Sequence, residues 1–415
     1  MTRFQIPYGA SAIELEIEAD LLELGSGGIK TPIGSAELIR QALRKPLCSR
    51  RLRELVASKK DPKIVIVVDD HTRDTPTELM LEALLDEIGE EHRGRITIVV
   101  ACGTHEPPSS EDINRIIGNK GGKFDIAIHN CDASDLVYVG TTSKGTPVRL
   151  NKIYVNADIR VLTGDITLHY YAGFGGGRKS ILPGISGRET IQKNHALLVE
   201  EHARTAHIEN NPVHLDMTEA ASFAPPDFVL NVVEAGKGNL RAAFAGDMTA
   251  VLQSGIEVAQ QLFSLKTHTT YDILFVSAGG FPKDRNLYQA SKAIEQCYRA
   301  VVPGGELILV AECREGMGDP YFEAWMDAYP TFPETEEAIR TNFVLGGHKA
   351  YYLRKVMTRI RLSVVSELNA HKLARWQIKG FKSLSEILQG GKSNTCKIGI
   401  VPKGVDTLLV PASNI

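Results

Sequence analysis

The sequence lacks clusters of cysteine. Its six cysteines stand alone, with no C-x-x-C pair and no tight group of cysteine and histidine, at positions 48, 102, 131, 297, 313 and 396. This spacing excludes a disulfide framework and a thiolate metal site. Any metal that the protein binds would therefore have to bring part of its ligand set with it.

Long apolar runs and an excess of positive charge are also missing. No segment approaches the roughly 18 apolar residues of a membrane span, and the start MTRFQIPYGASAIELEIE has no apolar core typical of a signal peptide. The 47 Lys and Arg against 50 Asp and Glu give a net charge of −3, so no global basic field would attract nucleic acid or an anionic membrane. We expect a cytoplasmic protein that binds neither.

What the sequence does contain is the pattern of parallel α/β structure. Its 415 residues exceed what one compact core usually holds. Short apolar runs alternate with segments of helical periodicity, which is typical of parallel sheets covered by helices. These runs lie at 63–68, 95–100, 124–128, 158–162, 271–276, 306–310 and 397–401. We expect two α/β lobes with mainly parallel sheets, an N-terminal domain at 1–268 and a C-terminal domain at 269–415.

Two helix starts stand out. Thr75-Pro-Thr-Glu78 has the pattern of a capping box with Thr75 as the N-cap. Ser186-Gly-Arg-Glu189 opens a second predicted helix that runs to about 203. On that helix Ile191, His195, Leu198 and His202 share one face, so His195 is expected to point inward.

Polar side chains follow several of the predicted strands. Ligands of open α/β sheets bind at the carboxyl ends of the strands, so chemistry is expected there. Asp70 and Arg73 follow the first run, and His105 and His169 follow two later ones. Both histidines stand beside small residues that leave room for a ligand, which favours a functional role for them over a structural one.

The stretch AGFGGGRKS at 172–180 resembles a phosphate-binding loop but does not match one. Arg178 separates the last glycine from Lys179, and it also breaks the dinucleotide pattern. Four glycines in five positions exceed what a turn needs and indicate a close approach of the backbone to something. Lys179 is either a point charge for a phosphate or an amine that bonds a carbonyl carbon, and the residues leave both open.

A further pair lies in LYQASKAI, where Tyr288 and Lys292 are one helical turn apart. A phenol and an ammonium on one face suit a carboxylate. The same Y-x-x-x-K spacing occurs in short-chain dehydrogenases, whose glycine fingerprint is absent here. An exposed amphipathic helix face explains the spacing equally well.

Taken together, these motifs resemble the nickel-pincer nucleotide-dependent lactate racemase family, whose members are racemases and epimerases of 2-hydroxy acids. The resemblance runs from about 5 to 405. It is carried by Asp70-His-Thr-Arg73, Gly103-Thr-His105, His169-Tyr-Tyr-Ala-Gly-Phe-Gly-Gly-Gly-Arg-Lys179-Ser-Ile-Leu-Pro-Gly, Asn194-His195 and Tyr288-Gln-Ala-Ser-Lys292.

The resemblance implies a cofactor. This is a nickel-pincer nucleotide, a pyridinium-3-thioamide-5-thiocarboxylic acid mononucleotide in which two thioacyl arms and a ring carbon hold nickel. Lys179 would be joined to it as a thioamide, and His195 would be the nickel ligand from the protein. Gly175, Gly176, Gly177 and Arg178 would contact the nucleotide, with Arg178 or Arg188 as the candidate for its phosphate.

The resemblance also implies a reaction. It is racemisation or epimerisation of a lactate-like 2-hydroxycarboxylic acid by reversible hydride transfer, with His105 and His169 as the acid/base pair. Arg73, oriented by Asp70, would polarise the substrate oxygens. The second lobe would bind the substrate carboxylate through Tyr288, Gln289 and Lys292, which places the active site in the cleft between the lobes.

The implied partners are the substrate and the cofactor-synthesis and nickel-insertion proteins. Two alternatives stay open at this point. One is a nicotinamide-dependent 2-hydroxyacid dehydrogenase that uses the Y-x-x-x-K pair, and the other is a non-enzymatic nickel-binding or nucleotide-binding protein. A non-enzymatic binding protein would give His105 and His169 no function.

Overall fold

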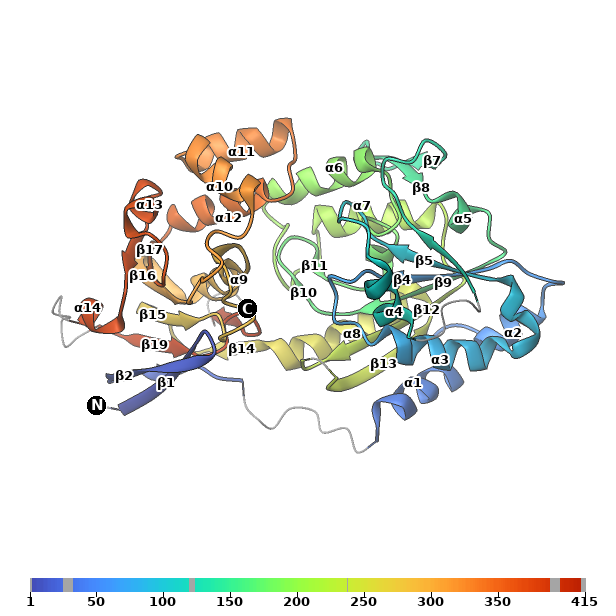
Figure 1. The fold of residues 1–415 in the computed structure, drawn as a ribbon, viewed down its shortest axis with the longest axis horizontal. Helices are drawn as coiled ribbons and strands as arrows, with labels where there is room; N and C mark the ends of the chain where they lie inside the picture. Colours follow the sequence, from blue (N-terminus) through green and yellow to red (C-terminus); the bar gives the residue numbers. More distant parts are fainter. Residues whose placement is uncertain (1, 25–32, 119–123, 237, 389–395, 412–415) are drawn as a thin grey trace. The chain divides into compact units, whose positions relative to one another are not determined.

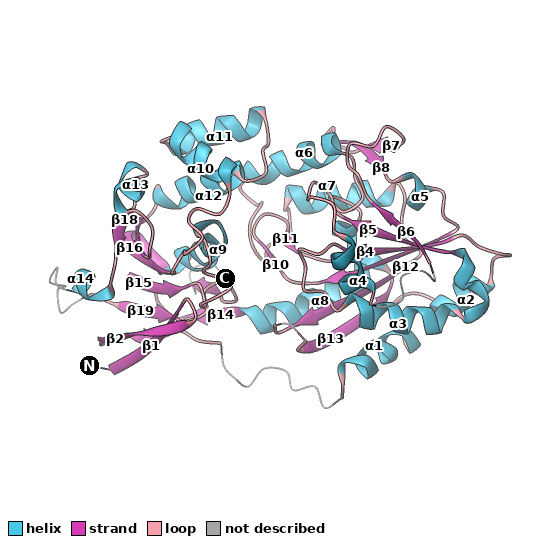
Figure 2. Cartoon of the chain, in the orientation of Figure 1, coloured by secondary structure: helices cyan, strands magenta, loops and turns pink. Residues whose placement is uncertain are grey.

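The computed structural model describes residues 2–24, 33–118, 124–236, 238–388 and 396–411. The chain forms two compact units (Figure 1). The central unit comprises Gly27–Leu262, and the composite unit comprises Met1–Ser26 together with Phe263–Ile415. Both units are α/β with mainly parallel sheets, which confirms the predicted fold class (Figure 2).

The sheet of the central unit is built on the predicted apolar runs. Its order among the described strands is β13-β12-β9-β4-β5-β6, and every neighbouring pair is parallel except β12 with β13. The chain builds outward from β4 to β5 and β6, and it then returns to the other side of β4 to form β9 and β12. The topological switch point, where ligands of such sheets usually bind, is therefore between β4 and β9.

The helices and strands of the central unit have the following bounds: α1 Ser35–Arg44, α2 Leu52–Ala57, β4 Ile64–Asp69, α3 Thr77–Ile88, η1 Glu90–Arg95, β5 Ile96–Ala101, α4 Ser110–Ile117, β6 Asp125–Ile128, β7 Val137–Thr141, β8 Pro147–Leu150, α5 Lys152–Val155, β9 Ile159–Asp165, β10 Leu168–His169, β11 Gly173–Phe174, η2 Gly177–Ser180, α6 Arg188–Ala196, η3 Leu197–Val199, α7 Pro212–Ser222, β12 Phe228–Glu234, β13 Leu240–Gly246 and α8 Met248–Phe263.

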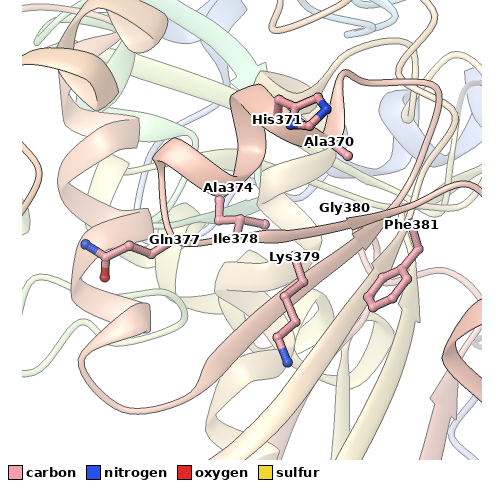
Figure 3. Close-up of a pocket in the computed structure, with 8 residues that line it drawn as sticks. All are labelled: Ala370, His371, Ala374, Gln377, Ile378, Lys379, Gly380 and Phe381. Carbon is pink, nitrogen blue, oxygen red and sulfur yellow. The ribbon is translucent and has the colours of Figure 1, made fainter. Parts of the chain in front are cut away.

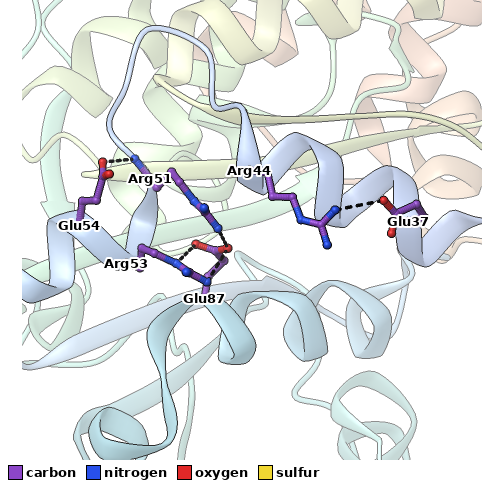
Figure 4. Close-up of polar contacts among 6 residues, drawn as sticks. All are labelled: Glu37, Arg44, Arg51, Arg53, Glu54 and Glu87. Atoms are coloured by element: carbon purple, nitrogen blue, oxygen red, sulfur yellow. Dashed lines mark hydrogen bonds and ion pairs between the residues drawn. The ribbon is translucent and has the colours of Figure 1, made fainter.

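Helices α1, α2 and α3 pack together with one face of this sheet around a shared apolar core. Glu87 on α3 is buried and takes ion pairs from Arg51 and Arg53 at the start of α2 (Figure 4). Because a buried carboxylate is stable only when it is paired, these arginines fix α2 on α3. This face supports the sheet and carries none of the expected site residues.

The start of the first predicted helix and the end of the second need correction, whereas the predicted opening at Ser186–Glu189 is confirmed by α6. Thr75 does not cap α3, because its hydroxyl donates to Asp69 Oδ2 at 2.7 Å, and the helix begins at Thr77. The second helix, α6, ends at Ala196 and continues only as the short η3, so it stops before 203 and His202 is exposed. His195 is only 4% exposed, which confirms its inward orientation.

The composite unit contains a second sheet, of order β18-β17-β16-β15-β19-β3 among the described strands, and all its pairs are parallel. Side chains alternate along β15, as the strand period requires. Leu274 and Val276 face a core formed with α9, α10, α12 and α13. Ile273 and Phe275 face a second core that is covered by the β1–β2 hairpin and α14.

The elements of the composite unit are β1 Thr2–Tyr8, β2 Ser11–Ile17, β3 Asp20–Leu21, β14 Ser264–Thr267, β15 Tyr271–Ser277, α9 Leu287–Cys297, η4 Tyr298–Ala300, β16 Val301–Val310, α10 Pro320–Ala328, α11 Phe332–Thr341, α12 Gly347–Met357, β17 Arg361–Val365, α13 Ala370–Arg375, β18 Lys379–Phe381, α14 Leu384–Leu388, β19 Ile398–Val401 and β20 Leu408–Pro411.

The expected division into 1–268 and 269–415 differs from the structure at the N-terminus. Strand β3 pairs with β19 at Gly399 and Ile400, and Ile6 and Leu15 of the β1–β2 hairpin are buried in the composite unit. The start of the chain therefore completes the sheet built by its end. Within the described residues, no helix combines the length and apolar character that crossing a membrane requires.

Candidate active site

The ends of β9, β4 and β5, three neighbouring strands of the central unit, deliver the four residues expected to act in catalysis. Asp70 directly follows β4, His105 lies in the turn after β5, and His169 lies in the short β10 after β9. Because these strands are parallel, their carboxyl ends lie at one edge of the sheet. The structure therefore brings together residues that are far apart in the sequence.

Asp70 and His105 form a direct pair. Asp70 is 3% exposed, and His105 Nδ1 donates to its Oδ2 at 2.7 Å. The hydroxyl of Thr72 donates to the other oxygen, Oδ1, at 2.6 Å. Burial alone would raise the pKa of Asp70, but the hydrogen bonds from His105 and Thr72 outweigh it and lower that pKa. The ionised carboxylate thus fixes the His105 ring with its proton on Nδ1 and its lone pair on Nε2.

Arg73 was expected to be oriented by Asp70, whose charge does act on Arg73, and the structure adds His105 as a direct hydrogen-bond partner of Asp70. The oxygens of Asp70 are engaged by His105 and Thr72. Loss of solvent opposes the charge of Arg73, but nearby carboxylates, Asp165 first, outweigh this effect and raise its pKa. Asp70 is therefore the orienting group of His105, and Arg73 is a positive charge that acts on the nearby carboxylates.

Two carboxylates that the sequence analysis did not single out lie at the switch point. Asp69 ends β4 and Asp165 ends β9, and a Cβ built on Gly164 would lie 3.6 Å from Asp69 Oδ2. Burial, and then the charge of Asp165, raises the pKa of Asp69 to about 6. Burial also raises the pKa of Asp165. The sequence signal that could have located these two carboxylates is an aspartate at the end of each of the two strands that flank the switch point.

His169 has surroundings opposite to those of His105. The backbone N–H of Ala172 donates to its Nδ1 at 3.2 Å, and its Nε2 lies 3.1 Å from Lys179 Nζ. Burial, followed by the charges of Lys179 and Arg73, lowers the pKa of His169 well below its ordinary value. The ring is therefore a neutral imidazole.

Lys179 lies in η2, which is anchored on the central sheet. The Ser180 hydroxyl donates to the Thr163 carbonyl of β9 at 2.9 Å, and the buried Asn231 of β12 accepts from Gly177 N at 2.8 Å. Burial, and then the charges of Arg73 and Arg178, lowers the pKa of Lys179 well below its ordinary value.

The glycines of this loop are explained by the protein itself. Gly176 has φ of +76°, and a Cβ there would lie 2.5 Å from Ile166. A Cβ on Gly175 would lie 3.1 Å from the Asp165 carbonyl, whereas Gly177 has space beside it but a φ of +54°. The close approach that the sequence indicated is thus between this loop and β9, and it is not evidence of a nucleotide.

Arg178 also differs from its expected role as a cofactor contact. It is fully buried, and its guanidinium donates to the carbonyls of Ala172, Phe174, Gly175 and Gly176 at 3.0 to 3.2 Å. These bonds direct the guanidinium into its own loop and away from any phosphate. Arg188, the other candidate, pairs with Asp132 at 2.7 Å on the surface.

His195 joins this group through Tyr171, a buried residue that the sequence analysis did not single out. The Tyr171 ring lies 4.4 Å from the ring of His169 and 5.1 Å from that of His195, and Lys179 Nζ lies 6.0 Å from its centre. Asn194 Oδ1 is 3.0 Å from His195 Nδ1, and the Asn194 amide is held by Asp216. His195 Nδ1 therefore donates, which places the ring's lone pair on Nε2, the nitrogen suited to a metal.

In the composite unit, α9 carries the residues expected to bind a carboxylate. Asn286 caps this helix by accepting from Gln289 N at 3.0 Å. Lys349 of α12 lies 5.8 Å from the Tyr288 ring centre. Burial, and then the charge of Lys292, lowers the pKa of Lys349 to about 7. Tyr288 and Lys292 thus share a face toward Lys349, a buried amine that the spacing of α9 alone could not reveal.

Comparison with known proteins gives this geometry a context. Residues 8–206 match the family model of the lactate racemase N-terminal domain, and residues 266–409 match that of the lactate racemase C-terminal domain. A lactate racemase from Thermoanaerobacterium thermosaccharolyticum is 30% identical over 428 residues, which cover 99% of each chain. The chain belongs to the lactate racemase family.

Other members and structures agree. A lactate racemase from Lactiplantibacillus plantarum is 28% identical and covers 99% of this chain and 100% of its own. The lactate racemase apoprotein from T. thermosaccharolyticum superposes with a TM-score of 0.90 at 28% identity, over 99% of this chain and 100% of that one. A Thermotoga maritima protein at 18% identity, with a TM-score of 0.66, shares the fold. The chain is thus an isomerase of the racemase type.

One pocket of this family member lies apart from the expected residues. It has a volume of about 550 Å³ in the composite unit, between α13 and β18 (Figure 3). Its lining consists of Ala370, His371, Ala374, Gln377, Ile378, Lys379, Gly380 and Phe381. The lining includes none of the residues expected at the active site.

Proposed function

We propose that this enzyme racemises a 2-hydroxycarboxylic acid such as lactate with a nickel-pincer nucleotide attached to Lys179. The observation that carries the proposal is the group formed by His169, Lys179 and His195 around Tyr171. These are the residues whose types suit a group that transfers protons, a covalent attachment point and a metal ligand. The names of the relatives support lactate as a substrate.

The side chains present fit such a cofactor. In the described part of the chain, no group of three or more His, Cys, Asp or Glu could hold a metal ion. His195 offers one imidazole nitrogen, so a metal here needs a carrier that brings its other ligands. Lys179 offers an amine for the covalent link, and the tightly packed η2 holds that amine in place.

The chemistry explains why a hydride acceptor is needed. Removing the α-hydrogen of a 2-hydroxycarboxylate as a proton would place a second negative charge beside the carboxylate. When bound, the nickel-pincer nucleotide supplies a hydride acceptor and so avoids that charge. The protein's own task is then to take and return the hydroxyl proton, which suits imidazoles at neutral pH.

We assign that task to His105 and His169. Asp70 holds the His105 ring so that Nε2 can accept the hydroxyl proton, and Arg73 stabilises negative charge on the substrate oxygens. Tyr288, Gln289 and Lys292 are proposed to bind the carboxylate. The 2-keto acid formed after proton and hydride leave would turn and accept them on its other face.

The test is expression with and without the cofactor-synthesis and nickel-insertion proteins, which we propose as partners. Co-expressed protein should gain the mass of the cofactor at Lys179, and a Lys179→Ala variant should not. Loaded protein should convert a single enantiomer of a 2-hydroxy acid to a mixture of both enantiomers. Chiral chromatography measures this conversion. Net oxidation that depends on NAD, with no added mass, would establish the dehydrogenase alternative instead.

A further inference from the structure

The hydrogen bonds of His169 define where its proton lies. The Ala172 N–H donates to Nδ1 at 3.2 Å, and a ring nitrogen that accepts a hydrogen bond carries no proton. Burial and the neighbouring cations keep this imidazole neutral by lowering its pKa. A neutral imidazole with an accepting Nδ1 carries its proton on Nε2.

The partner of that Nε2–H is the amine of Lys179, at 3.1 Å. An ammonium has three donors and no lone pair, so only the neutral amine can accept this bond. The opposite arrangement, in which an ammonium donates to Nε2, would put a proton on Nδ1. That proton would face the Ala172 N–H, and two donors would then meet at 3.2 Å.

The charges around the pair agree with a neutral amine. Burial lowers the pKa of Lys179 most, and Arg73 and Arg178 lower it further, while Asp69 and Asp165 oppose them. His214 of α7, a helix that packs against η2, is neutral because burial and then the charge of Arg178 lower its pKa to about 3. Groups on the other neighbouring elements contribute to the balance directly. The groups are Asp69 at the end of β4, Arg73 after it, Asp165 at the end of β9, Tyr171 after β10, Arg178 in η2 and His195 on α6.

We propose that the chain, before a cofactor is attached, holds Lys179 as a free amine that accepts a hydrogen bond from His169 and is ready to attack an acyl carbon. This inference rests on the proposed function, which makes Lys179 the attachment point. His169 thereby acts as a positioning residue for attachment, in addition to its task with the substrate.

The covalent step requires no oxidant or reductant. The amine first releases its hydrogen bond with His169 Nε2–H. Its lone pair then forms an N–C bond to the acyl carbon, and the bond from that carbon to its leaving group breaks with its electron pair. One N–H proton leaves with the departing group. The structure therefore presents Lys179 for acylation rather than for ion pairing.

The test is trace acetylation of the full-length chain, made without the cofactor-synthesis proteins, with N-hydroxysuccinimidyl acetate from about pH 6 to about pH 10. An exposed lysine reacts about tenfold more slowly for each unit that the pH is lowered in this range, because its free-amine fraction falls. Lys144, exposed on the β7–β8 turn, is the internal reference. Peptide mass spectrometry gives both rates.

Each rate is normalised to its own value at about pH 10, which removes differences in access and the hydrolysis of the reagent. The normalised rate of Lys179 should stay nearly constant and exceed that of Lys144 by about a hundredfold or more at about pH 7. A Lys179 rate that falls in parallel with that of Lys144 overturns the proposal. Absence of acetylation at every pH also overturns it, because such an amine could not be acylated.

Two matched variants assign the effect to His169. His169→Ala removes the Nε2–H donor and should make the Lys179 profile steeper, toward that of Lys144. His105→Ala, the same change at the other histidine, should keep the wild-type profile, and a wild-type profile in His169→Ala would contradict the role of His169. A flat profile together with a loaded but inactive enzyme would overturn the proposed function and leave this inference standing.

Discussion

His105 and His169 are the same residue type with the same proposed task, and their surroundings are opposite. His105 has a side chain that is 35% exposed, and its Nδ1 faces the ionised carboxylate of Asp70. His169 lies among Lys179, Arg73 and Arg178, and its Nδ1 faces the N–H of Ala172. Nδ1 of His105 thus contacts a hydrogen-bond acceptor, whereas Nδ1 of His169 contacts a hydrogen-bond donor.

This difference determines which nitrogen can do chemistry. Because Asp70 accepts a hydrogen bond from the protonated Nδ1 of His105, the lone pair of the ring lies on Nε2, which can act as a base. Because Ala172 donates to Nδ1 of His169, its Nε2 carries a proton and is an acid. The mechanism that we propose needs a group to take the hydroxyl proton and a group to return one, and the two contacts on Nδ1 suit the rings to these complementary steps.

Removing either ring should have the largest effect. His105→Ala and His169→Ala should each lower racemisation by roughly 10²- to 10⁴-fold in both directions, because each direction needs both proton transfers. The measurement is initial rates by chiral chromatography on protein whose cofactor load is fixed by intact mass. His371→Ala, in the pocket between α13 and β18, is the control and should keep the wild-type rate. A near-wild-type rate in either site variant would remove that ring from the mechanism.

The second largest effect is expected from removing the hydrogen bonds that hold the loop around His169. Arg178 donates to the Ala172 carbonyl, and the N–H of Ala172 holds the His169 ring. Arg178→Leu leaves buried carbonyls without donors and should lower the free energy of unfolding by about 3 kcal/mol. Arg188→Leu removes an exposed ion pair with Asp132 and should change it by less than about 1 kcal/mol. If chemical denaturation gave equal losses of unfolding free energy for the two variants, the role assigned to the Arg178 hydrogen bonds would be contradicted.

The support of His105 should matter less than the ring itself. Asp70→Asn keeps the size of the side chain but removes the charge that fixes the Nδ1 proton. We expect kcat to fall by about 10- to 100-fold with little change in stability. The rate of Asp132→Asn, which changes a surface carboxylate, should match wild type. A fall as large as that of His105→Ala would show that Asp70 does more than orient the ring.

The smallest effect concerns stability and pH. Burial, with Arg73 and Arg178, holds the pKa of Lys179 in the folded chain below its unfolded value of about 10.4. The unfolded chain then binds a proton that the folded chain does not, so stability falls as pH falls from about 10 toward the folded-state pKa. Without cofactor, Lys179→Met should unfold at a higher temperature than wild type at neutral pH. This difference should shrink as pH rises to about 10, and a variant that is never more stable would contradict the buried neutral amine.

Much of the fold follows from apolar runs, and the exceptions have physical reasons. All seven predicted runs lie in strands β4, β5, β6, β9, β15, β16 and β19. The fully buried β12 was missed because it follows a stretch broken by Asn210-Asn-Pro212 and Ala224-Pro-Pro226. The pairing of β3 with β19 was missed because nothing local in a short strand shows which sheet it will join.

The site residues, too, could be predicted from the sequence only in part. Strand ends show which residues reach an edge of the sheet, and this located Asp70, His105 and His169 correctly at such ends. They do not show which way a side chain turns, so Arg178 was expected to face a ligand and instead faces its own loop. Tyr171 was missed because its place in the site depends on contacts with three residues that lie on α6, β10 and η2.

The most direct test of the central claim uses a single enantiomer of 2-deuterated lactate and the loaded enzyme in ordinary water. If the histidines handle only the hydroxyl proton, the hydrogen on the α-carbon never exchanges with solvent, and the opposite enantiomer formed should keep its deuterium. Mass spectrometry of the chirally separated product measures this retention. Product that has lost its deuterium to solvent would mean that a histidine removes the α-hydrogen as a proton, and it would contradict the account.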